Sequence, residues 1–346
     1  MALDESRPWL SILIPAYNAA PYIGECLHSV ACQDIDGVEI LVTNDCSTDR
    51  TADIVERFAA GRPDVALTLL RNETNRGVSA TRNRMLDLCA GRHIWFVDAD
   101  DRMRPDSVGQ LKDIVIRHDP DLVICDFANY HKSNDDSFSN PVHTNVFNGP
   151  ERQLLEDRDM LLGGLFDCGR MYSWSRVAKR SVYGDELRFV EGRYFEDIHI
   201  APLQALRVKN YYYEPTPWID YRRAAGSIVA TMSPRKYSDM LLSMTEIVTE
   251  LRRPEHGLSR TALSRFDCFC VRQAISCMKT ELGGRHIADW APALTDFLEF
   301  PDKVLSNFGW VSRGKPTPKK IWLWFRLKKW QFRARAAIKH AASEKA

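Results

Sequence analysis

Residues 94–101 read Ile-Trp-Phe-Val-Asp-Ala-Asp-Asp, an apolar run that ends abruptly in three carboxylates. A continuous apolar run is typical of a strand that is buried on both faces of a sheet. Three carboxylates within four residues repel one another, and burying them without a partner is costly. Because hard oxygen ligands favour Mg²⁺ or Mn²⁺, the stretch predicts a strand that ends at a divalent cation. The alternative is a solvated acidic turn that caps the next helix.

This strand is part of a regular alternation of strands and helices over the first 127 residues. The apolar runs are continuous rather than alternating, as expected when helices cover both sheet faces. The pattern predicts an α/β fold with a mostly parallel sheet and helices on both faces. The expected strands are Leu10–Pro15, Val38–Thr43, Ala66–Arg71, His93–Val97 and Asp121–Phe127, and the expected helices cover residues 20–32, 48–60, 78–90 and 106–118.

Polar residues follow several of these strands, at the ends where an open parallel sheet binds its ligands. Pro15 to Asn18 follow the first strand, Asn44 to Asp49 the second, and Asp98 to Asp101 the fourth. We therefore expect the three groups to converge on one edge of the sheet. At that edge Tyr17 can stack on a flat ring. The Asp45 carboxylate can accept a hydrogen bond from a base or from a ribose hydroxyl.

These residues also have plainer interpretations. Ser47, Thr48 or Asp49 can cap the helix that follows, and Tyr17 can be an ordinary surface tyrosine. Arg82 lies on the second turn of a predicted helix, near enough to its N-terminus to reach a phosphate, or else on a solvated face. The sequence contains no glycine-rich dinucleotide loop, no phosphate-binding loop and no Gly-x-Ser-x-Gly elbow, which argues against those enzyme classes.

As a set, these motifs resemble family 2 glycosyltransferases of the GT-A fold, and in particular the bacterial enzymes that build exopolysaccharides and other cell-surface polysaccharides. Two positions depart from the family pattern: Asn44 replaces a usual acid, and Cys46 replaces a usual glycine. The resemblance covers roughly residues 9–232. It rests on Ile12–Asn18, Asn44–Asp49, Asn75–Gly77, Ala80–Asn83 and Phe96–Asp101, and then on Trp174–Arg180, Glu191–Gly192, Phe195–Asp197, Tyr221–Arg223 and Ser227–Ile228.

The resemblance implies an enzyme of the hexosyltransferase class. It would move a sugar, with inversion, from a nucleotide-diphosphate sugar to an acceptor hydroxyl. The expected donor is a UDP-sugar, and the expected acceptor is a lipid-linked glycan in bacterial polysaccharide biosynthesis. The expected cofactor is Mn²⁺ or Mg²⁺ on Asp100, and the expected general base is Asp197. Donor contacts are expected from Pro15, Tyr17, Asp45, Arg82 and Asp98.

The acceptor side is expected to include Trp174 and Glu196. Trp174 can equally be a core tryptophan, and Glu196 and Asp197 can simply match the dipole of a helix N-terminus. Two other functions remain open. A non-catalytic nucleotide- or glycan-binding protein on the same fold would be expected to lack the base. A sugar nucleotidyltransferase would be expected to have a glycine-rich, basic loop in place of Pro15–Asn18.

Beyond residue 127 the pattern becomes mostly helical. Residues 128–150 are polar and indicate a loop or a domain seam. We expect a transferase domain over residues 1–232, with a nucleotide half (9–127) and an acceptor half (150–232). A helical region (233–314) and a tail (315–346) follow. The expected helices cover residues 151–162, 195–207, 234–252, 258–282 and 287–299, with a strand-like patch near 209–213.

The tail is strongly basic. From Lys303 onward there are twelve Lys and Arg residues and one acid, so this part carries +11 and the rest of the chain −10. Basic charge combined with Trp and Phe is typical of an interfacial helix, and we expect residues 317–341 to bind an anionic membrane surface. The alternative is a helix packed on the protein's own core, and nothing else favours a nucleic-acid partner. The expected apolar face is Leu323, Leu327, Trp330, Ala334, Ala337, Ile338 and Ala341.

The start of the chain and the cysteines bear on location. Met1–Ser6 carries two acids and no basic cluster, which does not fit a signal peptide. No apolar stretch approaches the roughly 18–20 residues that span a bilayer. Nine cysteines without a Cys-x-x-Cys pair fit a reducing compartment. We therefore expect a cytoplasmic protein, peripheral on the cytoplasmic face of the inner membrane.

Overall fold

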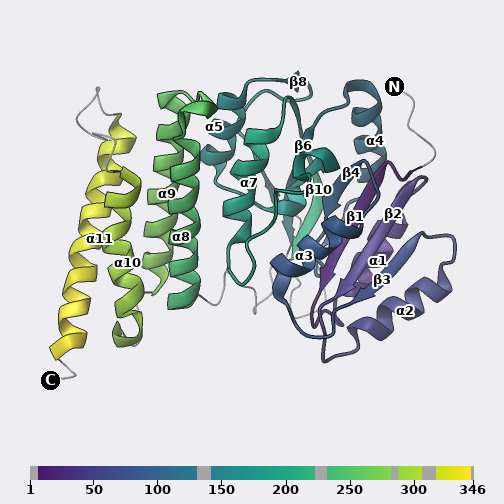
Figure 1. Ribbon diagram of the computed structural model, residues 1–346, viewed down its shortest axis with the longest axis horizontal. Helices are drawn as coiled ribbons and strands as arrows, with labels where there is room; N and C mark the ends of the chain where they lie inside the picture. The colour runs from purple at the N-terminus through teal and green to yellow at the C-terminus, as the bar shows by residue number, and fades with distance from the viewer. Residues whose placement is uncertain (1–6, 131–141, 223–231, 282–286, 306–316, 344–346) are drawn as a thin grey trace. The chain divides into compact units, whose positions relative to one another are not determined.

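The computed structural model describes residues 7–130, 142–222, 232–281, 287–305 and 317–343. The chain separates into two compact units (Figure 1). The first unit is Met1–Gly192 with Ile200–Ala224, and the second is Arg193–His199 with Ala225–Ala346. The sequence analysis placed a boundary at residue 232 and separated the tail from the helical region. In the division into compact units, the short internal segment 193–199 groups with the C-terminal helices, and the expected domain boundaries stay a prediction.

The first unit is built on a sheet whose strands run in the order β3-β2-β1-β4-β9-β6-β10-β5. Its parallel part confirms the predicted alternation. Right-handed crossovers place α1 and α2 on one face and α3, whose connection runs back, on the other. Consistently, α1 packs on α2, and α3 packs on β1 and β2. The elements are β1 (Leu10–Ala16), α1 (Ile23–Ala31), β2 (Val38–Asn44), α2 (Thr51–Gly61), β3 (Leu67–Arg71), α3 (Gly77–Leu88), β4 (His93–Phe96) and α4 (Ser107–His118).

The far half of the sheet is mixed, which the sequence analysis did not foresee. β9 (Arg176–Lys179) lies antiparallel between β4 and β6 (Leu122–Tyr130). β10 (Tyr211–Arg222) pairs in parallel with β6, and β5 (Arg102–Met103) pairs antiparallel with β10. The strand-like patch expected near 209–213 is thus the start of a strand of 12 residues. Two short strands, β7 (Val142–Thr144) and β8 (Leu154–Leu155), pair with β6 and β10.

Between β8 and β10 the chain forms short helices and strand β9, and it places Trp174 beside Trp95. The helix expected at 151–162 begins later, as α5 (Arg158–Cys168), because the Asp157 side chain caps it by accepting from Met160 N at 2.9 Å. The Trp95 indole donates to the Trp174 carbonyl at 2.8 Å and packs 5.5 Å from the Trp218 ring. The remaining elements are η1 (Ser173–Ser175), α6 (Arg180–Tyr183) and α7 (Glu196–Arg207).

In the part that the structure describes, the second unit contains the α-helices α8 to α11, a single-turn helix and the short segment 193–199. α8 (Pro234–Leu251) starts at a Ser233 cap and packs on α9 (Arg260–Glu281) and α10 (Ile287–Leu305). α11 (Pro318–Ser343) packs on α9 and α10. A single-turn helix, η2 (Pro254–His256), follows α8. None of the helices in the described ranges combines the length and low charge of a membrane-crossing segment.

The packing of α11 shows which face of this helix is buried and which is exposed. Leu323, Leu327 and Ala334, from the apolar face found in the sequence, are 0–2% exposed because α9 and α10 cover them. That face is therefore part of the unit's own core, which is the alternative that the sequence left open for this helix. On the other side of the helix, Trp322, Phe325 and Phe332 are 57%, 62% and 72% exposed.

Candidate donor-binding and catalytic site

Three carboxylates gather just beyond the end of β4, as the sequence predicts. One oxygen from each of Asp98, Asp100 and Asp101 lies within 4.8 Å of the others. Asp101 is buried, and its Oδ1 accepts a hydrogen bond from the Arg222 backbone amide at 2.8 Å. Its other oxygen, Oδ2, is buried with no donor in reach among the described residues. A donor set made only of carboxylate oxygens, one of them orphaned, fits a hard divalent cation.

Burial and mutual repulsion of the carboxylates outweigh the positive charges near this cluster. Burial, together with the neighbouring Asp98, raises the pKa of Asp100 to about 6. Burial and the other two carboxylates raise the pKa of Asp101 well above its usual range. The nearby Cys26 thiol also has a raised pKa, from burial first and then from the same acids. A bound cation would favour the charged carboxylates and relieve this strain.

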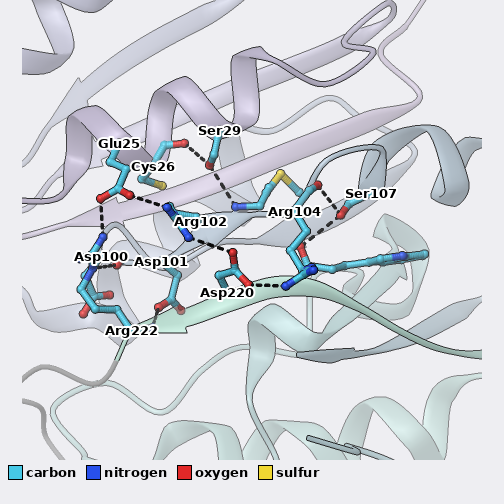
Figure 2. Close-up of polar contacts among 12 residues, drawn as sticks. Glu25, Cys26, Ser29, Asp100, Asp101, Arg102, Arg104, Ser107, Asp220 and Arg222 are labelled. Carbon is cyan, nitrogen blue, oxygen red and sulfur yellow. Dashed lines mark hydrogen bonds and ion pairs between the residues drawn. The ribbon is translucent and has the colours of Figure 1, made fainter. Parts of the chain in front are cut away.

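A network of ion pairs surrounds the cluster (Figure 2). Arg222, at the end of β10, donates through Nε to the Asp100 carbonyl at 2.9 Å and pairs with Glu25 on α1. Glu25 also pairs with Arg102 at 2.8 Å, and Arg102 pairs with Asp220 at 3.1 Å. The sequence analysis did not identify Glu25, Arg102 or Asp220, and only the Tyr221–Arg223 motif hinted at Arg222. The network joins α1, β5 and β10 around the carboxylates.

Arg82 lies inside the protein and does not extend from a solvated helix face. Its Nη2 pairs with Asp98 Oδ1 at 3.0 Å, and its side chain is 3% exposed. The guanidinium lies over the Phe96 and Phe189 rings, 5.6 and 5.2 Å from their centroids. Arg82 therefore fixes Asp98 directly. A contact from Arg82 to a donor phosphate stays a prediction.

Asp45 has its carboxylate engaged within the protein. It accepts hydrogen bonds from Asn72 Nδ2 at 2.6 Å, Arg76 N at 2.9 Å and Gly77 N at 2.8 Å. The last two are backbone amides at the start of α3, so the Asp45 carboxylate caps the N-terminus of that helix. Asp45 thus ties β2 to the loop before α3, and its expected contact with a nucleoside stays a prediction.

The loops after β1 and β2 are joined to each other. Asn18 Oδ1 accepts from Thr48 N at 2.8 Å, and Ala19 N donates to Thr51 Oγ1 at 2.8 Å. Pro15 lies near the end of β1, and Tyr17 beyond it is 50% exposed, so its ring is accessible for stacking. Cys46, which replaces a glycine of the family pattern, has a φ of +57°, in the left-handed region that glycine prefers.

The candidate acceptor-side tryptophan is a core residue. Trp174 is 1% exposed and stacks on Tyr172 and Tyr221, with ring centroids 4.8 and 5.5 Å apart. Burial raises the pKa of Tyr221, with further contributions from Tyr172 and the acidic cluster. Of this stack, Tyr172 and Tyr221 are the partly exposed members. An acceptor contact from Trp174 itself stays a prediction.

Glu196 and Asp197 open α7, as the sequence predicts, and they belong to the second unit. Just upstream, Phe189 is pinned to α3 of the first unit. Asn83 Oδ1 accepts from Phe189 N at 2.8 Å and Asn83 Nδ2 donates to Phe189 O at 2.9 Å. The sequence analysis quoted Asn83 within a motif but gave it no role.

Known proteins resemble this chain in sequence and in fold. A profile of the family described as glycosyl transferase family 2 matches residues 11–177. The Bacillus subtilis (strain 168) protein EpsH, named as a glycosyltransferase, is 27% identical over 279 residues, which cover 79% of this chain and 77% of EpsH. The chain spans 36% of GlyA, a glycosyltransferase of Streptococcus pneumoniae serotype 4, with 26% identity over 72% of this chain.

Solved structures show the same fold. Staphylococcus aureus TarS, residues 1–349 with UDP-GlcNAc, has a TM-score of 0.66 at 22% identity, covering 97% of this chain and 92% of that one. A Pyrobaculum calidifontis mannosyltransferase with GDP-Man and Mn²⁺ has a TM-score of 0.56 at 18% identity, covering 97% of this chain and 89% of that one. The predicted fold class is confirmed. The chain thus carries a glycosyltransferase family 2 domain on residues 11–177.

Proposed function

We propose that this protein transfers a sugar from a UDP-sugar to an acceptor hydroxyl, with inversion and with Mn²⁺ or Mg²⁺ held by Asp100 and Asp101 beside Asp98. The observation that carries the proposal is the three-carboxylate cluster with its orphaned Asp101 oxygen. TarS with UDP-GlcNAc and the mannosyltransferase with Mn²⁺ support the donor class and the cation.

In this proposal each side chain has a physical task. Asp100 and Asp101 hold the cation, Arg82 keeps Asp98 oriented towards the donor's ribose or sugar, and Tyr17 stacks on the base. When bound, the cation supplies positive charge for the diphosphate that leaves. Asp197 takes the proton from the acceptor hydroxyl as its oxygen attacks the anomeric carbon. Pro15 and Asp45 complete the nucleoside contacts.

The acceptor that we propose is a lipid-linked glycan, with Glu196 on its side of the site and the protein resting on an anionic membrane. The face of α11 that supports this differs from the one expected from sequence. Phe325 and Phe332 lie near the centre of its exposed face, and Lys328 and Lys329 are exposed between them. Exposed rings among cations fit the negative surface of the cytoplasmic leaflet.

Thermal unfolding with a panel of nucleotide-sugars, with and without Mn²⁺, tests the donor and cation. We expect UDP-GlcNAc or another UDP-sugar to raise the melting temperature only when Mn²⁺ is present. UDP release from the same donor then tests turnover. Stabilisation without UDP release would favour a non-catalytic binding protein, and an equal response without Mn²⁺ would contradict the metal site.

A further inference from the structure

The segment that carries the acidic pair Glu196–Asp197 is held by the C-terminal helices. Arg193–His199 belongs to the second unit, although residues on both sides of it belong to the first. α7 itself crosses this division, because the unit boundary falls after His199, within the helix. The contacts that hold this segment therefore determine where the first turn of α7 lies.

Two acids on α8 make those contacts. Glu246 Oε2 pairs with Arg193 Nη1 at 2.6 Å and lies 3.5 Å from His199 Nε2. Asp239 Oδ2 accepts a hydrogen bond from the Tyr194 backbone amide at 3.2 Å. Asp239 and Glu246 are seven residues apart, which is about two helical turns, so they lie on one face of α8. They reach both ends of the segment.

A third set of contacts holds the tyrosine in between. The Lys236 ammonium lies 5.2 Å from the Tyr194 ring centroid, and the Arg235 guanidinium lies 5.9 Å from it. Both cations come from the first turn of α8, one turn before Asp239. The face of an aromatic ring attracts such cations, so the side chain and the backbone amide of Tyr194 are both held by α8.

We call the contacts of Arg193 and Tyr194 with α8 the clamp. Phe195, which lies between these two residues and the acidic pair, has a strained backbone. Phe195 has a φ of +61°, in the left-handed region that is unfavourable for a residue with a side chain. Such a conformation persists only when its surroundings impose it. Arg193 and Tyr194 immediately precede Phe195, so their contacts with α8 are in place to impose it. Releasing them lets Phe195 relax and turns the start of α7.

We infer that α8 is a positioning element for the transfer reaction: Asp239 and Glu246 hold the strained turn that orients Glu196 and Asp197. This inference rests on the proposed function, in which Asp197 receives the acceptor's proton. α8 then contributes to catalysis, because it holds the segment that carries the general base Asp197. Arg193 and Glu246 act through Asp197 and need not touch a substrate.

The experiment compares Glu246→Gln and Arg193→Gln with a matched control. Glu299→Gln also neutralises a glutamate in an ion pair within the same unit, the exposed pair Lys303–Glu299 at 2.8 Å, far along the sequence from the clamp. The readouts are kcat and KM for UDP release from UDP-GlcNAc with Mn²⁺, and amide hydrogen exchange of residues 193–199. Asp239→Ala is a second route to the same loss if a Glu246 variant does not fold.

We expect the clamp variants to lower kcat about tenfold or more, because small misplacements of a catalytic group are that costly. KM for UDP-GlcNAc should stay within about twofold of wild type, since donor binding does not use these residues. Exchange at 193–199 should rise, and Arg193→Lys should recover most of kcat. Glu299→Gln should match wild type in every readout.

The outcomes separate this inference from the proposed function. Wild-type kcat and exchange in Glu246→Gln and Asp239→Ala, with Asp197→Asn inactive, would overturn the clamp and leave the proposed base intact. Full UDP release by Asp197→Asn would instead overturn the proposed base. If wild type releases no UDP from UDP-GlcNAc, that donor is wrong, and unchanged exchange at 193–199 in the clamp variants would still overturn the clamp.

Discussion

The Arg222 backbone amide donates a 2.8 Å hydrogen bond to Asp101 Oδ1, although 121 residues separate them. The Arg222 side chain also reaches the Asp100 carbonyl and Glu25. The end of β10 therefore closes over the acidic cluster and brings a positive charge to it. Arg222 lowers the pKa values of Asp100 and Asp101, against the larger raising effects of burial and of the neighbouring acids.

Removing this charge should destabilise the protein most when no cation is present. We expect Arg222→Ala to lower the free energy of unfolding by about 2–3 kcal/mol, the worth of a hydrogen bond to a charged group or somewhat more. Added Mn²⁺ should recover part of the loss by supplying the missing charge. The melting temperature should thus rise more with Mn²⁺ in this variant than in wild type. Arg104→Ala, which breaks a pair with Asp220 at 2.8 Å, is the control and should show the wild-type Mn²⁺ response.

Loss of a cluster carboxylate should abolish the response to the cation. Asp100→Asn is expected to remove the Mn²⁺-induced thermal shift and to lower UDP release on the order of a hundredfold, because a catalytic cation contributes several kcal/mol. Chelation of the metal from wild type should have the same effect. Asp113→Asn, at a 68% exposed side chain on α4, should change neither readout. A wild-type Mn²⁺ shift in Asp100→Asn would argue against the metal site.

Replacing Cys46, whose backbone is in the left-handed region, with glycine should raise the free energy of unfolding. Cys46→Gly relieves roughly 1–2 kcal/mol of backbone strain, offset by roughly 0.5–1 kcal/mol of extra unfolded-state entropy. We expect a net gain of about 0.5–1 kcal/mol, measured by urea unfolding. Cys46→Ala keeps the strain and loses only the thiol contact with the Glu73 carbonyl at 3.5 Å. If alanine stabilises as much as glycine, the strain is not the cause.

Acid should destabilise the first unit through His93. Burial lowers the pKa of His93 from 6.5 to about 4. Between these values the unfolded chain binds a proton that the folded chain does not, so stability falls as the pH falls. The loss is roughly 3 kcal/mol over that window. His93→Gln should flatten the dependence of unfolding free energy on pH, whereas His28→Gln, at an exposed position on α1, should leave the slope unchanged.

The exposed face of α11 should mediate binding to anionic lipid. The double change Phe325→Ser and Phe332→Ser is expected to weaken co-sedimentation with vesicles containing phosphatidylglycerol by about tenfold or more. The reason is that the variant loses the two aromatic rings that would insert into the lipid surface. Pure phosphatidylcholine should bind wild type weakly. Leu242→Ser, at a 45% exposed residue on α8, is the matched apolar control and should bind like wild type. Equal binding by the double variant would exclude this face, and altered self-association would instead point to a second copy as its occupant.

Local sequence signals predicted the parallel half of the sheet and the acidic cluster. β1 and β4 are mostly apolar and are followed by polar residues, so both the strand and its functional end can be read directly. β9 has only four residues, and β10 holds two prolines with register shifts beside them. Neither strand therefore shows a regular hydrophobic pattern by which it could be recognised in the sequence. The pairing of Glu25 with Arg222 spans 197 residues and leaves no local signal. The same holds for the clamp on Arg193, whose partner lies 53 residues away.

The position of β9 has a consequence for synthesis of the chain. β4 and β6 do not pair with each other, because β9 lies between them. As the first 127 residues leave the ribosome, the edges of both strands lack their partner until Lys179 has emerged. At roughly 5–20 residues per second that wait lasts roughly 3–10 seconds. During it, two apolar strand edges are open to wrong partners, so the nascent enzyme is most dependent on chaperones just before β9 is made.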